Sequence, residues 1–153
     1  MSISNLRNNL LGAWRLVSYI ETHVSTGAQR YPMGERANGI LIYSADGYMS
    51  SQIQAEGRAK YASGDMFTGT PDEYIAASRT FLSYTGRFHL DEQGGRIRHE
   101  MLISSFPNWV DQTQVRLVRY ADDRLSLSYE TPQLSNGEMI VAELIWKRAS
   151  PNP

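Results

Sequence analysis

Hydrophobic and polar residues alternate along several short segments of this chain, which is the pattern of β-strands with one buried face. The clearest example is the pair of segments 84–90 and 96–103, which flank a glycine-containing turn. Alternation places the following residues on one largely apolar face: Tyr84, Gly86, Phe88, Leu90, Ile97, His99, Met101 and Ile103. The other face is charged, and the register sets Arg87 opposite Glu100, a pair that favours a hairpin. The pattern therefore predicts an antiparallel hairpin with His99 on its inward face.

Further strands are predicted wherever this alternation recurs between turn-forming residues. They are expected at residues 12–24, 39–43, 48–54, 113–120, 124–131 and 138–148. The inward face of the first strand is expected to carry Trp14, Leu16, Ser18 and Ile20. Tyr19 and Glu21 then lie on its outward face. The pairing of 39–43 with 48–54 is ambiguous by one residue, which leaves the orientation of Tyr43 open.

Two-residue turns set the expected register of the last three strands. Arg116 is predicted opposite Tyr129, Tyr129 opposite Leu144, and Leu127 opposite Trp146. One apolar face thus continues from strand to strand along the chain. The sequence therefore predicts an all-β fold, an eight- to ten-stranded antiparallel up-and-down β-barrel, because closure removes the exposed edges of an open sheet.

Helical signals are confined to two places. The segment Thr70-Pro71-Asp72-Glu73 combines an N-cap, a proline at the first helical position and capping-box spacing, so one short helix is predicted over 71–82. Residues 1–11 are expected to form a short helix or an ordered lead-in.

Chain direction brings Trp14 and Trp146 to the same end of the barrel, where large rings would fill the floor. The opposite end is expected to be a polar, aromatic mouth.

Composition narrows the class of protein. The 153 residues fit a single domain, taken as 1–153, and the absence of cysteine excludes disulfides and thiolate metal sites. A net charge of −1 provides no excess of positive charge with which to bind nucleic acid or an anionic membrane. No signal peptide or membrane-spanning run is recognisable, so a cytoplasmic location is expected. The histidines lack the spacing of metal ligands, so no metal is predicted. The sequence has no phosphate-binding glycine loop, and no cofactor is predicted.

His99 is the first candidate for chemistry, because it is an imidazole on an apolar inward face. Burial lowers the pKa of histidine, so the neutral base would be available to move a proton on a bound molecule. The alternative is a core histidine that a neighbouring hydroxyl or carbonyl satisfies, since buried polar groups need partners anyway.

Arg116 and Tyr129 form a second candidate cluster, with Gln114 one alternation away on the same strand. A guanidinium in this position would bind a carboxylate or enolate oxygen, and the phenol would share the charge. The alternative is an internal ion pair or hydrogen-bond network that fixes strand register, with Glu143 or Glu130 as the partner if the register slips. Both interpretations remain open on the sequence alone.

The remaining candidates are expected to line or close a ligand cavity. Asn108 and Trp109 would shape its mouth, or else form a plain turn with an aromatic anchor. Tyr43 and Tyr84 would offer hydroxyl groups, although such tyrosines also serve as strand packing. The expected cavity walls are Leu16, Ile20, Phe88, Met101, Val118, Leu127 and Leu144.

Several motifs resemble a known family. Gly12-Ala13-Trp14, with Arg148 near the C-terminus, is similar to the Gly-x-Trp signature of lipocalins and the basic residue that packs over its indole. The segments 41–50, 84–88 and 106–110, with Gln114 and Arg116, resemble the bacterial and fungal lipocalin-like domain proteins. This resemblance implies a calycin-type barrel around a small, mostly apolar cavity. The resemblance is compatible with a binding protein and also with an isomerase or cyclase, the activity of some barrels of this kind in natural-product pathways.

These observations lead to one functional expectation with two alternatives. The protein is expected to bind one small, mostly apolar molecule whose oxygen-bearing group contacts His99, Arg116 and Tyr129. The first alternative is a cofactor-independent isomerase, cyclase or lyase that uses His99 as acid or base and Arg116 as the oxyanion partner. The second is a structural barrel whose interior is filled by side chains. An uncovered strand or exposed tyrosines would allow two copies to pair as a homodimer.

Overall fold

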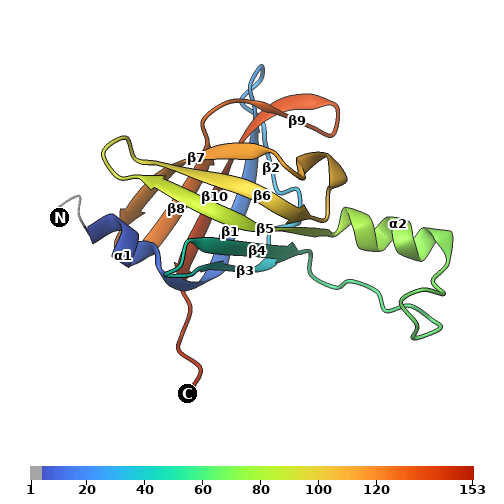
Figure 1. The fold of residues 1–153 in the computed structure, drawn as a ribbon. Coiled ribbons are helices and arrows are strands. Elements are labelled where there is room, and N and C mark those ends of the chain that lie inside the picture. The colour runs from blue at the N-terminus through green and yellow to red at the C-terminus, as the bar shows by residue number, and fades with distance from the viewer. Residues whose placement is uncertain (1–4) are drawn as a thin grey trace.

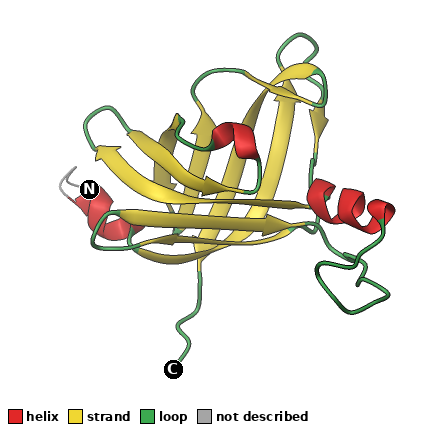
Figure 2. Cartoon of the chain, turned by 45° about the vertical axis from the view of Figure 1, so that its right-hand side comes forward, coloured by secondary structure: helices red, strands yellow, loops and turns green. Residues whose placement is uncertain are grey.

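The computed structural model describes residues 5–153, in which ten strands form one antiparallel sheet (Figures 1 and 2). The strands are β1 (Gly12–His23), β2 (Gln29–Arg30), β3 (Asn38–Tyr43), β4 (Tyr48–Gln54), β5 (Phe81–Asp91), β6 (Arg96–Ser104), β7 (Thr113–Ala121), β8 (Arg124–Tyr129), β9 (Gln133–Ser135) and β10 (Glu138–Arg148). Eight of them close into a barrel through pairing of β1 with β10, while β2 and β9 are short additions at its rim. The predicted all-β barrel is confirmed. Residues 1–4 of the expected domain and lead-in lie outside the described residues.

The helices add little to the barrel wall. They are α1 (Leu6–Leu10), α2 (Pro71–Arg79) and the 3₁₀ turn η2 (Pro107–Trp109). The predicted capping of α2 is confirmed, because the Thr70 hydroxyl accepts a hydrogen bond from the Glu73 amide at 3.2 Å. The helix ends earlier than predicted, since β5 begins at Phe81. Among residues 5–153 there is no helix whose length and apolar character would let it cross a membrane.

A β-bulge in β1 changes which side chains face inward. The pairing with β10 shifts between Leu16 and Ser18, so Val17 is an extra residue and the alternation inverts after it. Tyr19 and Glu21 are consequently buried, with 6% and 3% of their surface exposed. The predicted inward orientation of Ile20 and Ser18 is therefore wrong, and Ile20 does not belong to the inner wall.

A second irregularity lies in the hairpin of β5 and β6. The predicted pairing of Arg87 with Glu100 is confirmed, but the register shifts next to Gly86, so that Leu102 has no direct partner on β5. Ile103, expected to face inward, is 68% exposed for this reason. The backbone approaches closely at the bulge, because a Cβ atom on Gly86 would lie 1.8 Å from the carbonyl oxygen of Glu100.

The register between β8 and β10 also differs from the sequence prediction. Leu144 lies opposite Leu127, and Trp146 opposite Leu125, two residues away from the expected partners. The two-residue turn at 136–137 sets the register of β10 with β9 as predicted. Between β9 and β8 the register changes by two residues, so β10 pairs with β8 two residues away from the predicted positions. Because the slip is even, the inward faces remain as predicted. The pairing of Arg116 with Tyr129 between β7 and β8 is confirmed.

The predicted floor is present at the α1 end of the barrel. The indole nitrogen of Trp14 donates to the carbonyl of Leu10 at 2.9 Å, and the guanidinium of Arg148 stacks on the Trp14 ring at 3.9 Å. Arg148 also donates to the carbonyls of Leu11, at 2.6 Å, and Asn9. Trp14 and Trp146 are almost fully buried. One end of the barrel is thus sealed by α1 and by these stacked side chains.

Gly86 offers a test of the second bulge. We expect Gly86→Ala to lower the free energy of unfolding by about 3 kcal/mol or more, because the added methyl group overlaps the Glu100 carbonyl. Gly27→Ala is the control, since its φ of 72° is strained for alanine but nothing lies within 4 Å of the new atom; a cost of about 1 kcal/mol is expected there. Urea unfolding measures both, and equal losses would contradict the close approach.

Candidate functional site

Polar side chains from several strands meet inside the barrel. His99 on β6 is fully buried, and Arg116 on β7 is only 3% exposed. Gln114, on the same face of β7, is 6% exposed. The hydroxyl-bearing rings around them come from β1, β3, β5 and β8: Tyr19, Tyr43, Tyr84 and Tyr129. We call this group of seven residues the interior polar cluster.

His99 has one partner and one unsatisfied nitrogen. Its Nε2 atom lies 2.8 Å from the hydroxyl of Tyr43, and its Nδ1 atom is buried without a hydrogen-bond partner among the described residues. Burial, followed by the positive charge of Arg116, lowers the pKa of His99 to about 3. The imidazole is therefore neutral near neutral pH. The open orientation of Tyr43 is also resolved, because its ring points inward and is 1% exposed.

Arg116 is held by neutral groups alone. Its guanidinium lies over the ring of Tyr129 at 4.2 Å, and it donates to the Gln114 side-chain oxygen and to the Val115 carbonyl at 3.2 Å. No carboxylate of the described residues lies within 4.0 Å of it. The two acids that the sequence offered as partners are engaged elsewhere. Glu130 pairs with Arg96, and Glu143 accepts from Ser126.

The buried tyrosines of the cluster are uncharged near neutral pH. Burial raises the pKa of Tyr19, Tyr43 and Tyr84, and for the last two the positive charge of Arg116 acts in the opposite direction without overcoming it. Tyr129 adds to the rise in the pKa of Tyr19, and Ser51 acts against the rise in the pKa of Tyr84. Tyr19, Tyr43 and Tyr84 therefore present neutral hydroxyl groups to the guanidinium of Arg116.

Sequence reasoning missed two inward residues, Tyr19 and Glu21, because the bulge at Val17 inverts the alternation. Glu21 is nearly fully buried, but its carboxylate is paired with Arg30 at 2.7 Å and accepts from the Ser135 hydroxyl at 2.9 Å. These contacts tie β1, β2 and β9 together at the rim opposite α1. Simple alternation gives no sign of a bulge, so neither residue could be assigned inward from the sequence.

The expected mouth residues divide into two groups. Trp109 is half-buried, with its ring edge-on to Tyr84 at a centroid distance of 5.8 Å, so it contacts the cluster. Asn108 is exposed and is not part of the cluster. The predicted apolar wall residues Phe88, Met101, Leu127 and Leu144 are buried, and Leu16 and Val118 are half-buried against the core.

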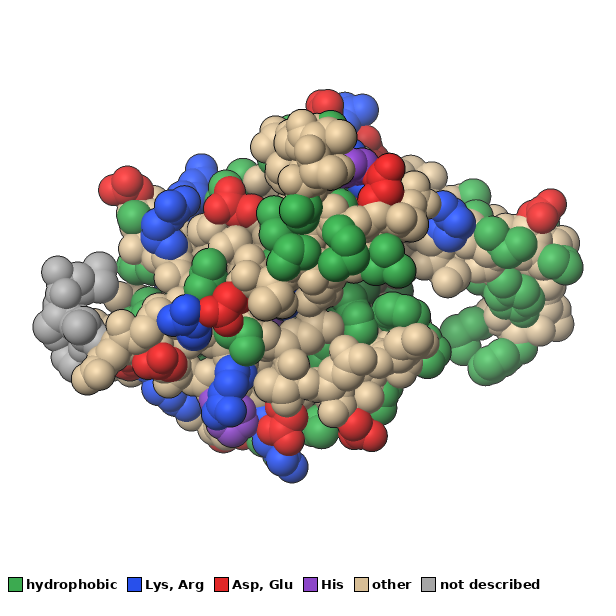
Figure 3. Space-filling model, turned by 90° about the horizontal axis from the view of Figure 1, so that it is seen from above, with side chains coloured by type: hydrophobic (Ala, Val, Ile, Leu, Met, Phe, Trp, Pro, Cys, Tyr) green, Lys and Arg blue, Asp and Glu red, His purple; other side chains and the backbone are tan. Residues whose placement is uncertain are grey.

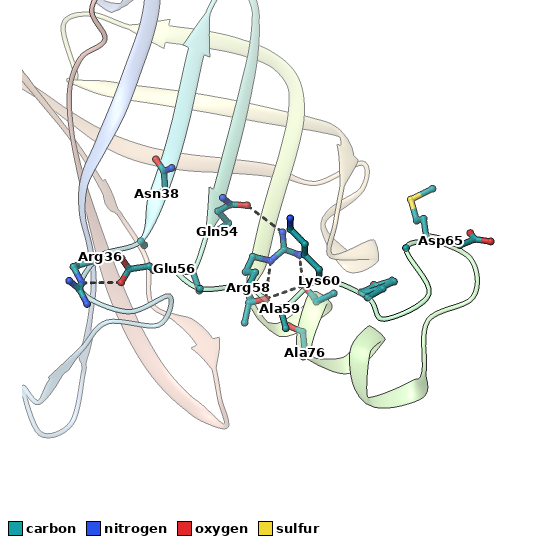
Figure 4. A pocket seen from close by; sticks show the side chains of 17 residues that line it. Arg36, Asn38, Gln54, Glu56, Arg58, Ala59, Lys60, Asp65 and Ala76 are labelled. Atoms are coloured by element: carbon teal, nitrogen blue, oxygen red, sulfur yellow. Dashed lines mark hydrogen bonds and ion pairs between the residues drawn. The ribbon is translucent and has the colours of Figure 1, made fainter.

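A separate groove of about 1310 Å³ lies outside the barrel, between the ends of β3 and β4, the loop after β4, and α2 (Figure 4). Its arginines already have partners. Arg58 donates to Gln54, Ala77 and Thr80, and Arg36 pairs with Glu56 at 2.9 Å. The contacts of Arg58 attach the loop after β4 to the C-terminal end of α2, and the pair of Arg36 with Glu56 joins this loop to the segment before β3. Neither arginine is buried without a partner. The interior polar cluster is therefore the stronger candidate site.

The segment formed by α2 and its preceding loop protrudes from the barrel and carries hydrophobic side chains on its surface (Figure 3). Phe67 is the most exposed of these, at 82%.

Within residues 5–153, no cluster of three or more histidine, aspartate or glutamate side chains is arranged to hold a metal ion.

A closed eight-stranded barrel with a polar cluster in its interior is an architecture of proteins that hold one small ligand. The chain belongs to the lipocalin-like domain family, whose model matches residues 11–149. It is also 32% identical over 106 residues to the 4'-hydroxy-3'-methoxypropiophenone carrier protein of Aspergillus oryzae, an alignment that covers 65% of this chain and 96% of that protein. The family resemblance is thus confirmed, and fold and relative together support small-molecule binding as the general function.

The burial of His99 predicts an acid-dependent loss of stability. In the unfolded chain the imidazole takes up a proton near its ordinary pKa of 6.5, whereas in the fold it does so only at about 3. Between these values the unfolded state binds more protons, so stability falls as the pH is lowered, by up to about 1.4 kcal/mol per pH unit.

Urea unfolding near neutral pH and near pH 5 tests this expectation. We expect His99→Gln to lose part of the acid sensitivity of the parent protein, because glutamine does not titrate. His89→Gln is the matched control, since the side chain of His89 is 49% exposed on the same hairpin. An unchanged pH dependence in His99→Gln would contradict the depressed pKa.

Proposed function

We propose that this protein binds one small, mostly apolar molecule inside the barrel, with an oxygen-bearing group of the molecule placed against Arg116. The observation that carries this proposal is the buried guanidinium, which has no carboxylate partner within residues 5–153. Removing a charge from water is costly, and hydrogen bonds to neutral groups offset only part of that cost. An oxygen atom of a ligand would complete the interactions of Arg116.

His99 supports the same location. Its Nδ1 atom is buried and has no partner in the described part of the chain, whereas buried polar atoms in native proteins are nearly always hydrogen-bonded. Depending on the tautomer, this nitrogen donates to or accepts from a second polar group on the ligand. The apolar side chains of Phe88, Met101, Leu127 and Leu144 would contact the remainder of the molecule.

The relative in Aspergillus oryzae suggests the kind of molecule to test. Its name describes a carrier of an aromatic ketone with a hydroxyl and a methoxy group. Such a molecule combines a flat apolar ring with oxygen atoms at its two ends. We therefore propose this chemical class, a small oxygenated aromatic compound, as the first to be tried with the present protein.

The same geometry ranks the two alternatives below binding. A base whose conjugate acid has a pKa of about 3 removes protons poorly near neutral pH, where the best general bases have matching pKa values. This weakens the proposal that His99 drives an isomerase, cyclase or lyase reaction. A purely structural barrel gains nothing from a buried guanidinium that has no carboxylate partner among the described residues, so Arg116 favours binding over a filled barrel.

Binding of 4'-hydroxy-3'-methoxypropiophenone, measured by isothermal titration calorimetry, tests the proposal. Arg116→Gln is expected to weaken binding by about 10- to 100-fold, which corresponds to the loss of one hydrogen bond to a charged group. Arg119→Gln is the matched control, because Arg119 lies on the same strand with its side chain 77% exposed. Urea unfolding confirms that both variants are folded. Equal affinities of the two variants would contradict the assignment of Arg116 to the site.

A further inference from the structure

We infer that the barrel binds its ligand as an oxyanion, so that its ligands are small apolar acids whose phenol, enol or carboxyl group is deprotonated against Arg116. This inference rests on the proposed function and adds the charge state of the bound molecule.

The interior contains one cation without a matching anion among the described residues. The cation is Arg116 on β7, and the inward titratable groups of the other strands are Tyr19 and Glu21 on β1, Tyr43 on β3, Tyr84 on β5, His99 on β6 and Tyr129 on β8. The buried residues of the two remaining strands carry no charge: Met49, Ser51 and Ile53 on β4, and Ile140, Ala142, Leu144 and Trp146 on β10.

None of these groups neutralises Arg116. Glu21 is the only buried carboxylate among residues 5–153, and its charge is already matched by Arg30 at 2.7 Å. The buried phenols of Tyr43 and Tyr84 have raised pKa values, and His99 is neutral. A neutral ligand would leave the interior with a net positive charge in a medium of low polarity. An anionic ligand would cancel that charge.

The guanidinium is also arranged to receive an anion. It carries five N–H donors, and its contacts with Gln114 and Val115 use only part of this set. The ring of Tyr129, 4.2 Å away, supports one face of the guanidinium and holds its plane. A planar guanidinium fixed in this way is suited to charge-assisted hydrogen bonds with an oxyanion.

Desolvation acts against ionisation and must be outweighed. At Tyr43 and Tyr84 it prevails, because these phenols are intrinsically weak acids and feel Arg116 only through space. A ligand oxygen in direct contact with the guanidinium gains a much stronger attraction. A phenol with a ketone in the para position is in addition a stronger acid than tyrosine, since the carbonyl delocalises the negative charge.

The absorption spectrum of a bound probe tests the inference directly. The phenolate of 4'-hydroxy-3'-methoxypropiophenone absorbs at longer wavelength than the phenol, so its ionisation is visible in the presence of excess wild-type protein. We expect the bound probe to ionise at a pH lower by about one unit or more than the free probe, as for an acid beside an opposite charge. Affinity should rise with pH until the free probe is itself ionised.

Two further compounds define the class. The dimethoxy ether of the probe cannot ionise and is expected to bind at least about 10-fold more weakly. A dimethoxybenzoate of similar size carries a carboxylate in place of the phenolate, and tighter binding of either anion than of the ether supports the inference. The Arg116→Gln variant should lose the spectral shift, and Arg119→Gln should retain it.

The outcomes separate this inference from the proposed function. A probe that binds with the phenol spectrum, together with an ether of equal affinity, overturns the oxyanion inference and leaves small-molecule binding intact. If the probe, the ether and the benzoate all fail to bind the wild-type protein, both proposals are wrong for this chemical class. The spectrum of the wild-type complex decides the question even if Arg116→Gln does not fold.

Discussion

Pairing between β1 and β10 is the constraint on which the interior depends. It closes the sheet, so that side chains from strands far apart in the sequence face one enclosed volume. Arg116 and Tyr129 meet across one ladder, whereas Tyr43 and His99 approach each other across the barrel interior, from β3 and β6. Without closure, the inward groups would lie on an open surface, where water would screen Arg116 and leave the pKa of His99 near its ordinary value.

Arg116 has an influence beyond its direct contacts because it lies among buried side chains, where charges are weakly screened. Its charge contributes to the pKa values of His99, Tyr43 and Tyr84, which lie on three other strands. A charge with this reach is expensive to keep where only neutral groups compensate it. A buried charge of this kind is easier to explain in a barrel that binds a ligand than in a structural barrel whose interior is filled by side chains.

Much of the fold and part of the site followed from alternation alone. His99, Gln114 and Arg116 lie on regular stretches of strand, so their inward orientation could be predicted from parity. Tyr19 and Glu21 could not, because the bulge at Val17 leaves no mark in the pattern of hydrophobic residues. Two-residue turns fixed adjacent registers well, but the slip between β8 and β9 depends on how an irregular connection packs. The chemical roles of these residues remain predictions.

The seal made by α1, Trp14 and Arg148 has a kinetic consequence. Because that end is blocked, a molecule bound as proposed would have to arrive and depart at the opposite rim, where Glu21 joins Arg30 and Ser135. Its residence time would then be governed by fluctuations of this rim as much as by contacts at the bottom. A barrel that is sealed at one end would favour slow release of such a molecule over rapid passage.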